Sequence, residues 1–401
     1  MSKLEELIEQ YCPDGVEYYK IKDVYKRIKG TPITAGKMKE IATPDGSVRI
    51  FAGGKTVIDA NEKDIPNANI TRVPAVLIQS RGVIDAVYYD KPFTFKNEMW
   101  AYTTFNQKSV KYLYYILKSN IQTFRDAASG MGALPQISLG VTEEFEIPVP
   151  PLPVQEEIVR ILDNFTELQA ELQAELQKRK QQYNYYLDNL LNFNNINRGG
   201  YQAEVRWMKL KDVCMKTSNI KWKSTTGQYR YIDLSSVDIQ THSIISTIEI
   251  DKMSAPSRAQ QIVQEDDVIF ATTRPTQMRA CIIPTQYNGD ICSTGYCVLR
   301  VDTKILLPRF LFFSLTVSGF KTYLSNNLTL GNYPSISNNT LLEYEVPVPS
   351  LANQQRIVAI LDRFDTLTTD LTQGLPAEIE KRRQQYEFYR DKLLTFKRKE
   401  A

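Results

Sequence analysis

The sequence has few of the residues that usually bind metals or form disulfides. It contains one histidine, His242, and five cysteines, an odd number with no Cys-x-x-Cys pair among them. A zinc site of the Cys/His type needs more ligands at closer spacing, and a disulfide framework needs paired cysteines. We therefore expect reduced, buried thiols in a cytoplasmic protein that binds no metal.

Long apolar runs and targeting segments are also missing. No stretch approaches the roughly 18 consecutive apolar residues of a transmembrane helix. The first ten residues are acidic and amphipathic, whereas a signal peptide begins with a basic region followed by an apolar one. We expect neither a membrane partner nor export.

Motifs of catalysis and nucleotide binding fail when they are compared with their templates. The segment from Gly30 to Met38 resembles a phosphate-binding loop, but five residues separate its glycines instead of four, and Met38 stands where a Ser or Thr must reach the metal. Asn332-Tyr-Pro-Ser335 lacks the second proline and the aromatic residue of the Asn-Pro-Pro-aromatic motif of adenine methyltransferases. A single histidine argues against a Ser–His–Asp or Cys–His system. The sequence predicts a chain without catalytic residues or cofactors of its own.

The bulk composition is that of an ordinary globular protein. Hydrophobic residues make up 42% of the 401 residues and charged residues 24%, and the formal net charge is +3. At roughly 100–200 residues per domain, the length predicts two or three domains. The mild positive charge permits a nucleic-acid partner, but a DNA-binding surface would have to come from local basic clusters.

An internal repeat is the strongest positive feature. Residues 145–152 match 344–351 at an offset of 199 (344 − 145), and residues 179–183 match 382–386 at an offset of 203 (382 − 179). The second copy therefore carries four extra residues (203 − 199). Upstream segments align only faintly, as in 19–24 with 208–213 and 134–138 with 333–337. A helical frame repeated faithfully beside diverged modules predicts two separate specificities.

The order of segments is module, helix, module, helix, and we expect an α+β fold. Each module is predicted to be mixed α/β with a curved, partly antiparallel sheet. A pair of long antiparallel helices, related by a pseudo-two-fold axis, is expected to separate the modules. The predicted first module, central helix, second module and C-terminal helix span 1–145, 146–197, 198–343 and 344–401.

Apolar residues in both helical copies recur at steps of three and four, which is a heptad seam. A helix with one apolar seam needs a partner, and the nearest partner is the other copy. The alternative is a surface helix in each copy that packs on its own domain. Gly374-Leu-Pro376 is expected to interrupt the second helix. The predicted interface residues are Ile158, Ile161, Phe165, Leu168, Leu172, Ile357, Ile360, Phe364, Leu367 and Leu371.

A tandem tetrapeptide lies within the first helical copy, where residues 167–177 read Glu-Leu-Gln-Ala, Glu-Leu-Gln-Ala and Glu-Leu-Gln. Each unit would lengthen a helix by about 6 Å, close to the rise of two base pairs. We interpret the repeat as a ruler between the modules. The alternative is a plain helix surface that measures nothing.

Polar and basic residues follow a predicted strand in each module, at 77–82 and at 270–277. Arg81 and Arg274 are predicted to correspond, at an offset of 193 (274 − 81). Arg is the usual bidentate donor to guanine and Gln to adenine, while Lys, Ser and Thr contact phosphates or bases. Each residue alone also fits a solvated loop or a structural turn, but the duplicated set predicts DNA contact. The predicted DNA-binding residues are Lys29, Gln79, Ser80, Arg81, Gln136, Lys221, Lys223, Thr273, Arg274, Gln277, Arg279, Asn332 and Tyr333.

These features together resemble one protein family. The twice-occurring Pro-Val-Pro…Gln-x-x-Ile-Val-x-Ile-Leu-Asp segments and the Arg-(Lys/Arg)-Gln-Gln-Tyr…Leu-Leu-x-Phe endings resemble those of Type I restriction–modification specificity subunits. The resemblance spans the whole chain and implies that each module reads one half of a split double-stranded DNA sequence, with the helices setting the gap. It also implies partners for phage defence: two methyltransferase subunits with S-adenosylmethionine for adenine N6 transfer, and restriction–translocase subunits with ATP and Mg.

Two other functions stay open. The chain could be a DNA-binding adaptor that works without methyltransferase partners, or, from another class, a nuclease with unrecognised catalytic residues. Co-purification with methyltransferase subunits, or a neighbouring gene that encodes an Asn-Pro-Pro-aromatic methyltransferase, would separate them.

Overall fold

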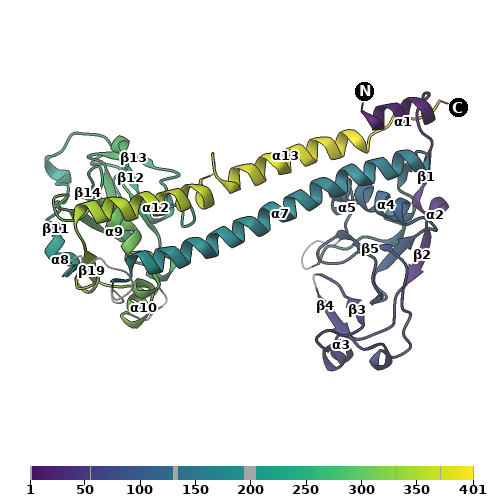
Figure 1. The fold of residues 1–401 in the computed structure, drawn as a ribbon, viewed down its shortest axis with the longest axis horizontal. Coiled ribbons are helices and arrows are strands. Elements are labelled where there is room, and N and C mark those ends of the chain that lie inside the picture. The colour runs from purple at the N-terminus through teal and green to yellow at the C-terminus, as the bar shows by residue number, and fades with distance from the viewer. Residues whose placement is uncertain are drawn as a thin grey trace. The chain divides into compact units, whose positions relative to one another are not determined.

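The computed structural model describes residues 2–54, 56–129, 134–193, 205–329, 331, 333–370 and 372–400. These residues form two compact units. Unit 1 comprises Met1–Ala170 with Lys381–Ala401, and unit 2 comprises Glu171–Glu380. Each unit contains one module together with segments of the repeated helices (Figure 1). A module thus forms its compact unit with helical segments that lie outside its predicted range.

Unit 1 is built around a four-stranded antiparallel sheet in the order β2-β8-β5-β6. A smaller sheet, β4-β3-β7, pairs β3 with β7 in parallel, and β1 pairs with β9. The strands are β1 (Tyr18–Lys20), β2 (Lys26–Lys29), β3 (Val48–Phe51), β4 (Val57–Ala60), β5 (Ala75–Gln79), β6 (Asp85–Tyr89), β7 (Phe93–Phe95), β8 (Trp100–Thr103) and β9 (Glu146–Pro148). The helices are α1 (Lys3–Tyr11), α2 (Ile21–Val24), α3 (Ala35–Ile41), α4 (Gln107–Ser119), α5 (Ile121–Asp126) and α6 (Leu139–Glu143).

Unit 2 repeats the strand order of the main sheet and has one more strand in its second sheet. Its four-stranded antiparallel sheet has the order β11-β18-β15-β16, and its second sheet, β13-β12-β17-β14, again contains one parallel pair, β12 with β17. The strands are β10 (Arg206–Lys209), β11 (Cys214–Met215), β12 (Tyr229–Ile232), β13 (Ile248–Ile250), β14 (Ala259–Ile262), β15 (Val268–Ala271), β16 (Ala280–Ile282), β17 (Ile291–Ser293), β18 (Tyr296–Val301) and β19 (Glu345–Val348). The helices are α8 (Leu210–Val213), α9 (Pro308–Ser314), α10 (Ser318–Asn326) and α11 (Asn338–Leu342). The predicted mixed α/β modules and the internal repeat are confirmed.

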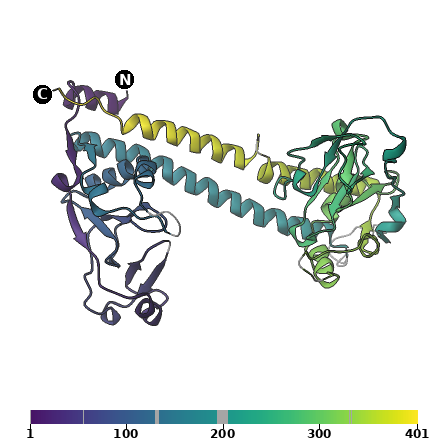
Figure 2. The same cartoon turned by 180° about the vertical axis from the view of Figure 1, so that it is seen from behind.

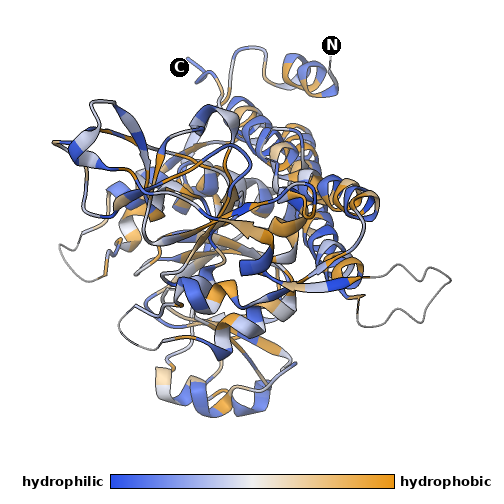
Figure 3. Cartoon of the chain, turned by 90° about the vertical axis from the view of Figure 1, so that its left-hand side faces the viewer, coloured by the Kyte–Doolittle hydropathy of each residue, from blue (hydrophilic) through white to orange (hydrophobic). Residues whose placement is uncertain are grey.

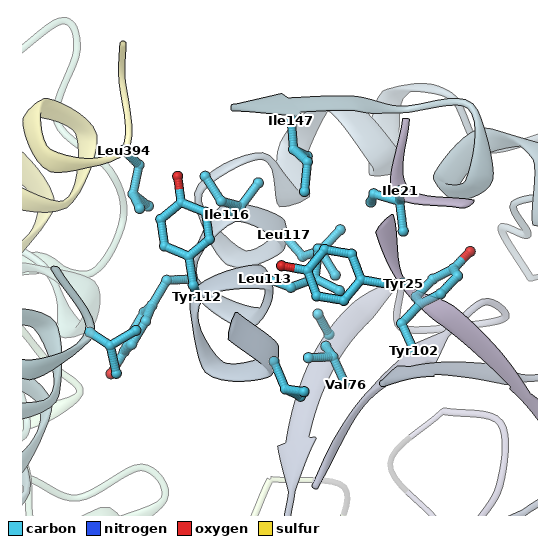
Figure 4. Packing of buried hydrophobic residues seen from close by; sticks show 14 of the residues in the cluster. Ile21, Tyr25, Val76, Tyr102, Tyr112, Leu113, Ile116, Leu117, Ile147 and Leu394 are labelled. Carbon is cyan, nitrogen blue, oxygen red and sulfur yellow. The ribbon is translucent and has the colours of Figure 1, made fainter. Parts of the chain in front are cut away.

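The main core of unit 1 lies between α4, the four-stranded sheet and the start of the long helix α7 (Leu152–Leu191). Figure 4 shows Leu113 and Leu117 of α4 packed toward Val76 on β5, and Tyr112 of the same helix belongs to the same cluster. Leu394, from the end of the chain, joins the same cluster. Each such fully buried side chain stabilises the fold by about 1.5–3 kcal/mol. In Figure 3, hydrophobic residues are frequent on the strands, and hydrophilic residues are frequent on the turns.

A double ion pair fastens the start of each module to its end, and it occurs twice. In unit 1, Glu144 binds Lys20, at 2.7 Å, and Lys22. In unit 2, Glu343 binds Lys209 at 2.8 Å and also Lys211. The hydrogen bonds from the two lysines lower the pKa of Glu144 to about 2. These equivalent contacts confirm the faint alignment of 19–24 with 208–213.

The repeated helices pair in opposite directions within each unit. In unit 1, Phe165 of α7 stacks on Tyr389 of α13 (Leu375–Leu393), with ring centroids 5.6 Å apart. In unit 2, Phe364 of α12 (Leu351–Thr369) stacks on Tyr186 of α7 at 5.2 Å. Phe165 and Phe364 are equivalent in the repeat, as are Tyr186 and Tyr389, so the two units form the same aromatic contact with the roles of the helical copies exchanged. Figures 1 and 2 show α7 beside α13 and beside α12. The predicted antiparallel pairing is confirmed, and none of the described helices is long and apolar enough to cross a membrane.

The predicted seam serves two purposes along its length. Ile158 and Ile357, near the start of each copy, are buried in the core of their own module, as the alternative interpretation expected. Farther along, the helix–helix contacts of Phe165 and Phe364 take over. The buried face is wider than a heptad seam because a helix that seals a globular core needs a broad apolar stripe. Ile161, Leu168, Leu172, Ile360 and Leu367 are half-buried, and Leu371 lies outside the described residues.

The second helical copy is interrupted as predicted. Asp370 follows α12, and its side chain accepts hydrogen bonds from the backbone of Thr372 and Gln373. Gly374 then turns the chain into α13, and a Cβ atom there would lie 2.5 Å from the carbonyl oxygen of Thr366. Only glycine fits this approach, whereas α7 runs through the tetrapeptide repeat without a break.

Candidate nucleic-acid interface

The central strand of each module ends in a turn that a distant loop holds in place. In unit 1 the turn after β5 consists of residues 80–82, and we call it turn 1. The carbonyl of Ser80 accepts from the backbone N–H of Ile137 at 2.9 Å. The N–H of Gly82 donates to the carbonyl of Pro135 at 2.8 Å. Turn 1 is therefore pinned by a segment more than fifty residues farther along the chain.

The turn after β15, which we call turn 2, consists of residues 272–274 and has the same frame. The carbonyl of Thr272 accepts from the N–H of Ile336 at 2.9 Å. The N–H of Arg274 donates to the carbonyl of Pro334 at 2.7 Å. A side-chain hydrogen bond is repeated as well: the Ser80 hydroxyl donates to the carbonyl of Glu98, and the Thr272 hydroxyl donates to the carbonyl of Gly295.

This frame corrects the predicted equivalence of the two arginines. The hydrogen bonds align Arg81 with Thr273 and Gly82 with Arg274, an offset of 192 (274 − 82) instead of 193. Gly82 and Arg274 also share a left-handed backbone, with φ of +79° and +52°. A non-glycine residue pays roughly 1–2 kcal/mol for that conformation. At Arg274 the hydrogen bond from its N–H to the carbonyl of Pro334 holds the backbone in this conformation.

Arg81 is the exposed basic group of turn 1. Its guanidinium makes no hydrogen bond or ion pair with any residue that the structure describes, while its backbone is fixed by a bridge to Gln136. A cavity of about 410 Å³ opens beside it, and Arg81, Lys39 and Lys96 contribute to its lining. Gln136 is exposed as well. Arg81 and Gln136 are thus placed where a nucleic acid could reach them.

Two residues predicted to contact DNA in this module are buried instead. Gln79 is 6% exposed and donates from Nε2 to the carbonyl of Gly54 at 2.9 Å. Ser80 is fully buried and donates to the carbonyl of Glu98. These polar side chains satisfy backbone carbonyls of neighbouring loops, which would otherwise be unpaired in the interior. The structure therefore corrects their expected role from contact to positioning.

Turn 2 presents an arginine that is stacked on an aromatic ring. The Arg274 guanidinium lies 4.8 Å from the centroid of Tyr333, and both side chains are exposed. Gln277, in the short helix η5 (Pro275–Gln277), is exposed, and Thr273 is half-buried. An arginine held on a ring keeps its hydrogen-bond donors free in a restricted orientation.

Arg279 and Asn332 are two further predicted residues of the second module. Arg279 is half-buried, and its guanidinium donates to the carbonyl of Val237. It therefore holds the loop at 237, and its contact with DNA stays a prediction. Asn332 lies outside the described residues.

The predicted phosphate-binding lysines are exposed. Lys29 ends β2, and Lys221 and Lys223 flank Trp222. The indole N–H of Trp222 donates to the carbonyl of Ala259 at 2.7 Å, so the ring anchors the short turn to the module. An anchored ring between two exposed lysines gives them a fixed place on the surface.

Thiols and carboxylates do not gather into a metal site in the described part of the chain. No group of three or more His, Cys, Asp or Glu there could hold a metal ion. The cysteines are free, and four of them are buried, including Cys281 and Cys297. Burial raises the pKa of each of these two thiols to about 12, so both stay protonated at neutral pH.

Sequence reasoning missed the charged residues that share the cavity with Arg81. Lys39 comes from α3, and Lys96 and Glu98 come from the connection between β7 and β8. No linear motif joins these positions to Arg81. The pairing of β3 with β7 and of β5 with β8 brings Lys96 and Glu98 to the end of β5, where Arg81 follows.

Comparison with known proteins places this geometry in a family. The family model described as "Type I restriction modification DNA specificity domain" matches residues 13–182 and 202–381. The specificity subunit of the Type I restriction enzyme EcoR124I/EcoR124II from Escherichia coli is 32% identical over 316 residues, which cover 74% of this chain and 73% of that protein. The specificity subunit of the Type I restriction enzyme MpnII from Mycoplasma pneumoniae is 27% identical over 322 residues, which cover 66% of this chain and 92% of that protein.

A solved structure shows the same fold over nearly the whole length. The Type I restriction–modification S subunit from M. genitalium matches with a TM-score of 0.57 and 17% identity, covering 94% of this chain and 95% of that one. Both copies of the repeat thus match the family's domain, and the chain belongs to the family of Type I restriction–modification DNA specificity subunits.

Proposed function

We propose that this chain is a non-catalytic DNA reader of a bipartite site, with one half-site for each module. It directs adenine N6 methyltransferase subunits and restriction subunits to that site. The observation that carries the proposal is the pair of turns 1 and 2, which share one hydrogen-bonded frame and present different side chains. A shared frame with different chemistry suits two readers of the same type with different targets.

The differences lie at equivalent positions. Where turn 1 has Arg81, turn 2 has Thr273, and where turn 1 has Gly82, turn 2 has Arg274. An arginine offers bidentate donors that match guanine O6 and N7 in the major groove. Because the two arginines sit one position apart in the frame, they would address different base positions within their half-sites. The exposed Lys29, Lys221 and Lys223 would bind phosphates and supply affinity that does not depend on sequence.

The helix pair is proposed to set the gap between the half-sites. The tetrapeptide repeat lies in the uninterrupted helix α7, so each unit adds about 6 Å of helix. Deleting residues 171–174 should therefore shorten the DNA spacer that the enzyme recognises. An unchanged spacer in the methylation pattern of the deletion variant would refute the ruler.

Family membership and the repeat support the proposed partners. The E. coli relative is named as the specificity subunit of a Type I restriction enzyme. Two copies of the helical frame offer two equivalent faces, which suits two methyltransferase subunits. S-adenosylmethionine, ATP and Mg would then belong to the partner subunits. Recovery of a complex with two methyltransferase subunits supports the proposal, whereas a lone chain that cleaves or methylates DNA overturns it.

The proposed base recognition is tested by replacing each arginine separately. Arg81→Ala and Arg274→Ala, assembled with the methyltransferase subunits, should each relax recognition in a different half-site, by about 1–3 kcal/mol. Arg72→Ala is the matched control, because Arg72 is also exposed but forms an ion pair with Glu62 at 2.6 Å. Uniform weakening on all sequences would reassign the two arginines to phosphate contacts.

A further inference from the structure

Glu98 lines the same cavity as Arg81 in the first module. Its backbone carbonyl accepts the hydrogen bond of Ser80 in turn 1. Its carboxylate pairs through Oε1 with Lys96 at 2.9 Å, and its side chain is 27% exposed. A Cβ atom built on Gly53 would lie 3.7 Å from this Oε1. Glu98 therefore extends over the glycine turn that follows β3.

Two cavities meet at this residue. Glu98 lines the cavity of about 410 Å³ beside Arg81. It also lines a neighbouring cavity of about 630 Å³, to which Lys29, Asn69 and Asn97 contribute. The Oε2 atom of Glu98 has no hydrogen-bond partner among the described residues. A carboxylate oxygen with free acceptor capacity thus stands between a free guanidinium and an exposed lysine.

The second module has a different residue at the same place in the frame. Thr272 donates to the carbonyl of Gly295 at 3.0 Å, as Ser80 does to that of Glu98, so Gly295 is the equivalent of Glu98. The equivalent of Gly53 follows from the parallel strand pairs. Phe51 pairs with Phe95 in unit 1 and Ile232 pairs with Cys292 in unit 2, so Phe51 and Ile232 are equivalent. Gly53 lies two positions after Phe51 and Leu234 lies two positions after Ile232, so Leu234 is the equivalent of Gly53.

The glycine and the larger residue are therefore exchanged between the modules. In unit 1, Glu98 extends over Gly53. In unit 2, a Cβ atom on Gly295 would lie 3.0 Å from Leu234. One module fills this position with an acceptor from the β7–β8 connection, and the other fills it with an apolar side chain from the opposite loop. This exchange marks the position as one where the modules differ in chemistry while the frame is kept.

We propose that Glu98 is a specificity-determining residue of the first module, and that it accepts a hydrogen bond from the exocyclic amino group of a base. An ionised carboxylate is an acceptor only, so it matches cytosine N4 or adenine N6 and is repelled by the acceptors of guanine and thymine. Arg81 in the same cavity supplies the donors, so the two side chains together fit the two edges of a base pair in the major groove. This proposal rests on the proposed function.

The test uses Glu98→Gln in the complete complex with methyltransferase subunits, with methylation measured on a DNA library randomised in both half-sites. The amide keeps the size of the side chain but adds a donor. Discrimination should fall about 5- to 150-fold at one position of the first half-site, and the second half-site should not change. The base preferred there by the unsubstituted complex, cytosine or adenine, identifies the amino group.

The matched control is Asp163→Asn. Asp163 is 27% exposed and pairs with Lys111 at 2.8 Å, so it has the same exposure and the same kind of partner as Glu98, but it lies on α7 and lines neither of the two cavities. Full discrimination by Glu98→Gln at every position would overturn the proposal, as would a uniform loss on all sequences. Glu98→Asp, which keeps the acceptor, should retain the base preference. Absence of any half-site preference in the unsubstituted complex would instead refute the proposed function.

Discussion

The repeat contains a natural comparison between two buried glutamines. Gln354 is fully buried in unit 2, and its side chain makes three hydrogen bonds with the backbone: Nε2 donates to the carbonyls of Ile305 and Pro349, both at 2.9 Å, and Oε1 accepts from the N–H of Leu307 at 2.8 Å. Gln155, its equivalent in unit 1, is 5% exposed and makes one such bond, to the carbonyl of Pro150 at 2.7 Å.

Replacement of each glutamine by methionine should therefore have very different costs. Gln354→Met keeps the volume but leaves three backbone groups unpaired, one of them buried and two partly buried, at about 1–3 kcal/mol each. We expect a loss of about 3 kcal/mol or more in the free energy of unfolding. Gln155→Met also leaves one carbonyl unpaired, but it removes Oε1, which has no partner among the described atoms. The two effects oppose each other, so the expected loss is about 1 kcal/mol or less.

Urea unfolding of the two variants, together with hydrogen exchange at the Leu307 amide, tests this expectation. In Gln354→Met, the exchange of that amide should accelerate, because its acceptor is gone. The same amide should be unaffected in Gln155→Met. Equal losses of stability, or a larger loss in Gln155→Met, would refute the reasoning that backbone pairing distinguishes these two positions.

Three other expectations follow from the fold. Because the pKa of Glu144 is lowered from 4.5 to about 2, its contribution to stability is present above pH 4.5 and is lost as the pH falls toward 2. The stability difference between Glu144→Gln and the unsubstituted chain, measured by urea unfolding, should close over that range; a difference that persists at pH 2 would contradict it. Gly374→Ala should promote proteolytic cleavage between α12 and α13, since its Cβ would meet backbone oxygen at 2.5 Å, whereas Gly319→Ala, with nothing within 4 Å, should not. A double-mutant cycle on Phe165 and Tyr389 should give a coupling free energy of about 0.5–1.5 kcal/mol in thermal unfolding. A coupling of zero would mean that this aromatic contact does not stabilise the helix pair.

Much of the fold could be read from local patterns. The apolar steps of three and four placed α7 and α12, and Gly374 with its following proline placed the break, because these signals depend on near neighbours in the chain. The predicted seam was narrower than the buried face of the helices. Leu162 and Leu361 are fully buried and were not foreseen, since periodicity shows a stripe but not how much core it must cover.

The candidate site was predicted less well. Arg81 and Arg274 are exposed as expected, but their register differs by one residue. Gln79 and Ser80 have the composition of a binding loop and instead pair with carbonyls of Gly54 and Glu98. A polar residue at the end of a strand looks the same in sequence whether its partner is a base or a distant backbone group.

The sequence by itself determined the repeated helical frame, the two modules and the family, because the helices show in steps between near neighbours and the repeat shows in similar segments at a nearly constant offset. The tertiary structure alone decided which side chains face outward from turns 1 and 2, and it alone brought Glu98 beside Arg81. The physical reason is that these positions depend on hydrogen bonds across long stretches of chain, such as Ile137 to Ser80 and Ile336 to Thr272. Such pairings are chosen by the packing of the whole module, and no local periodicity encodes them.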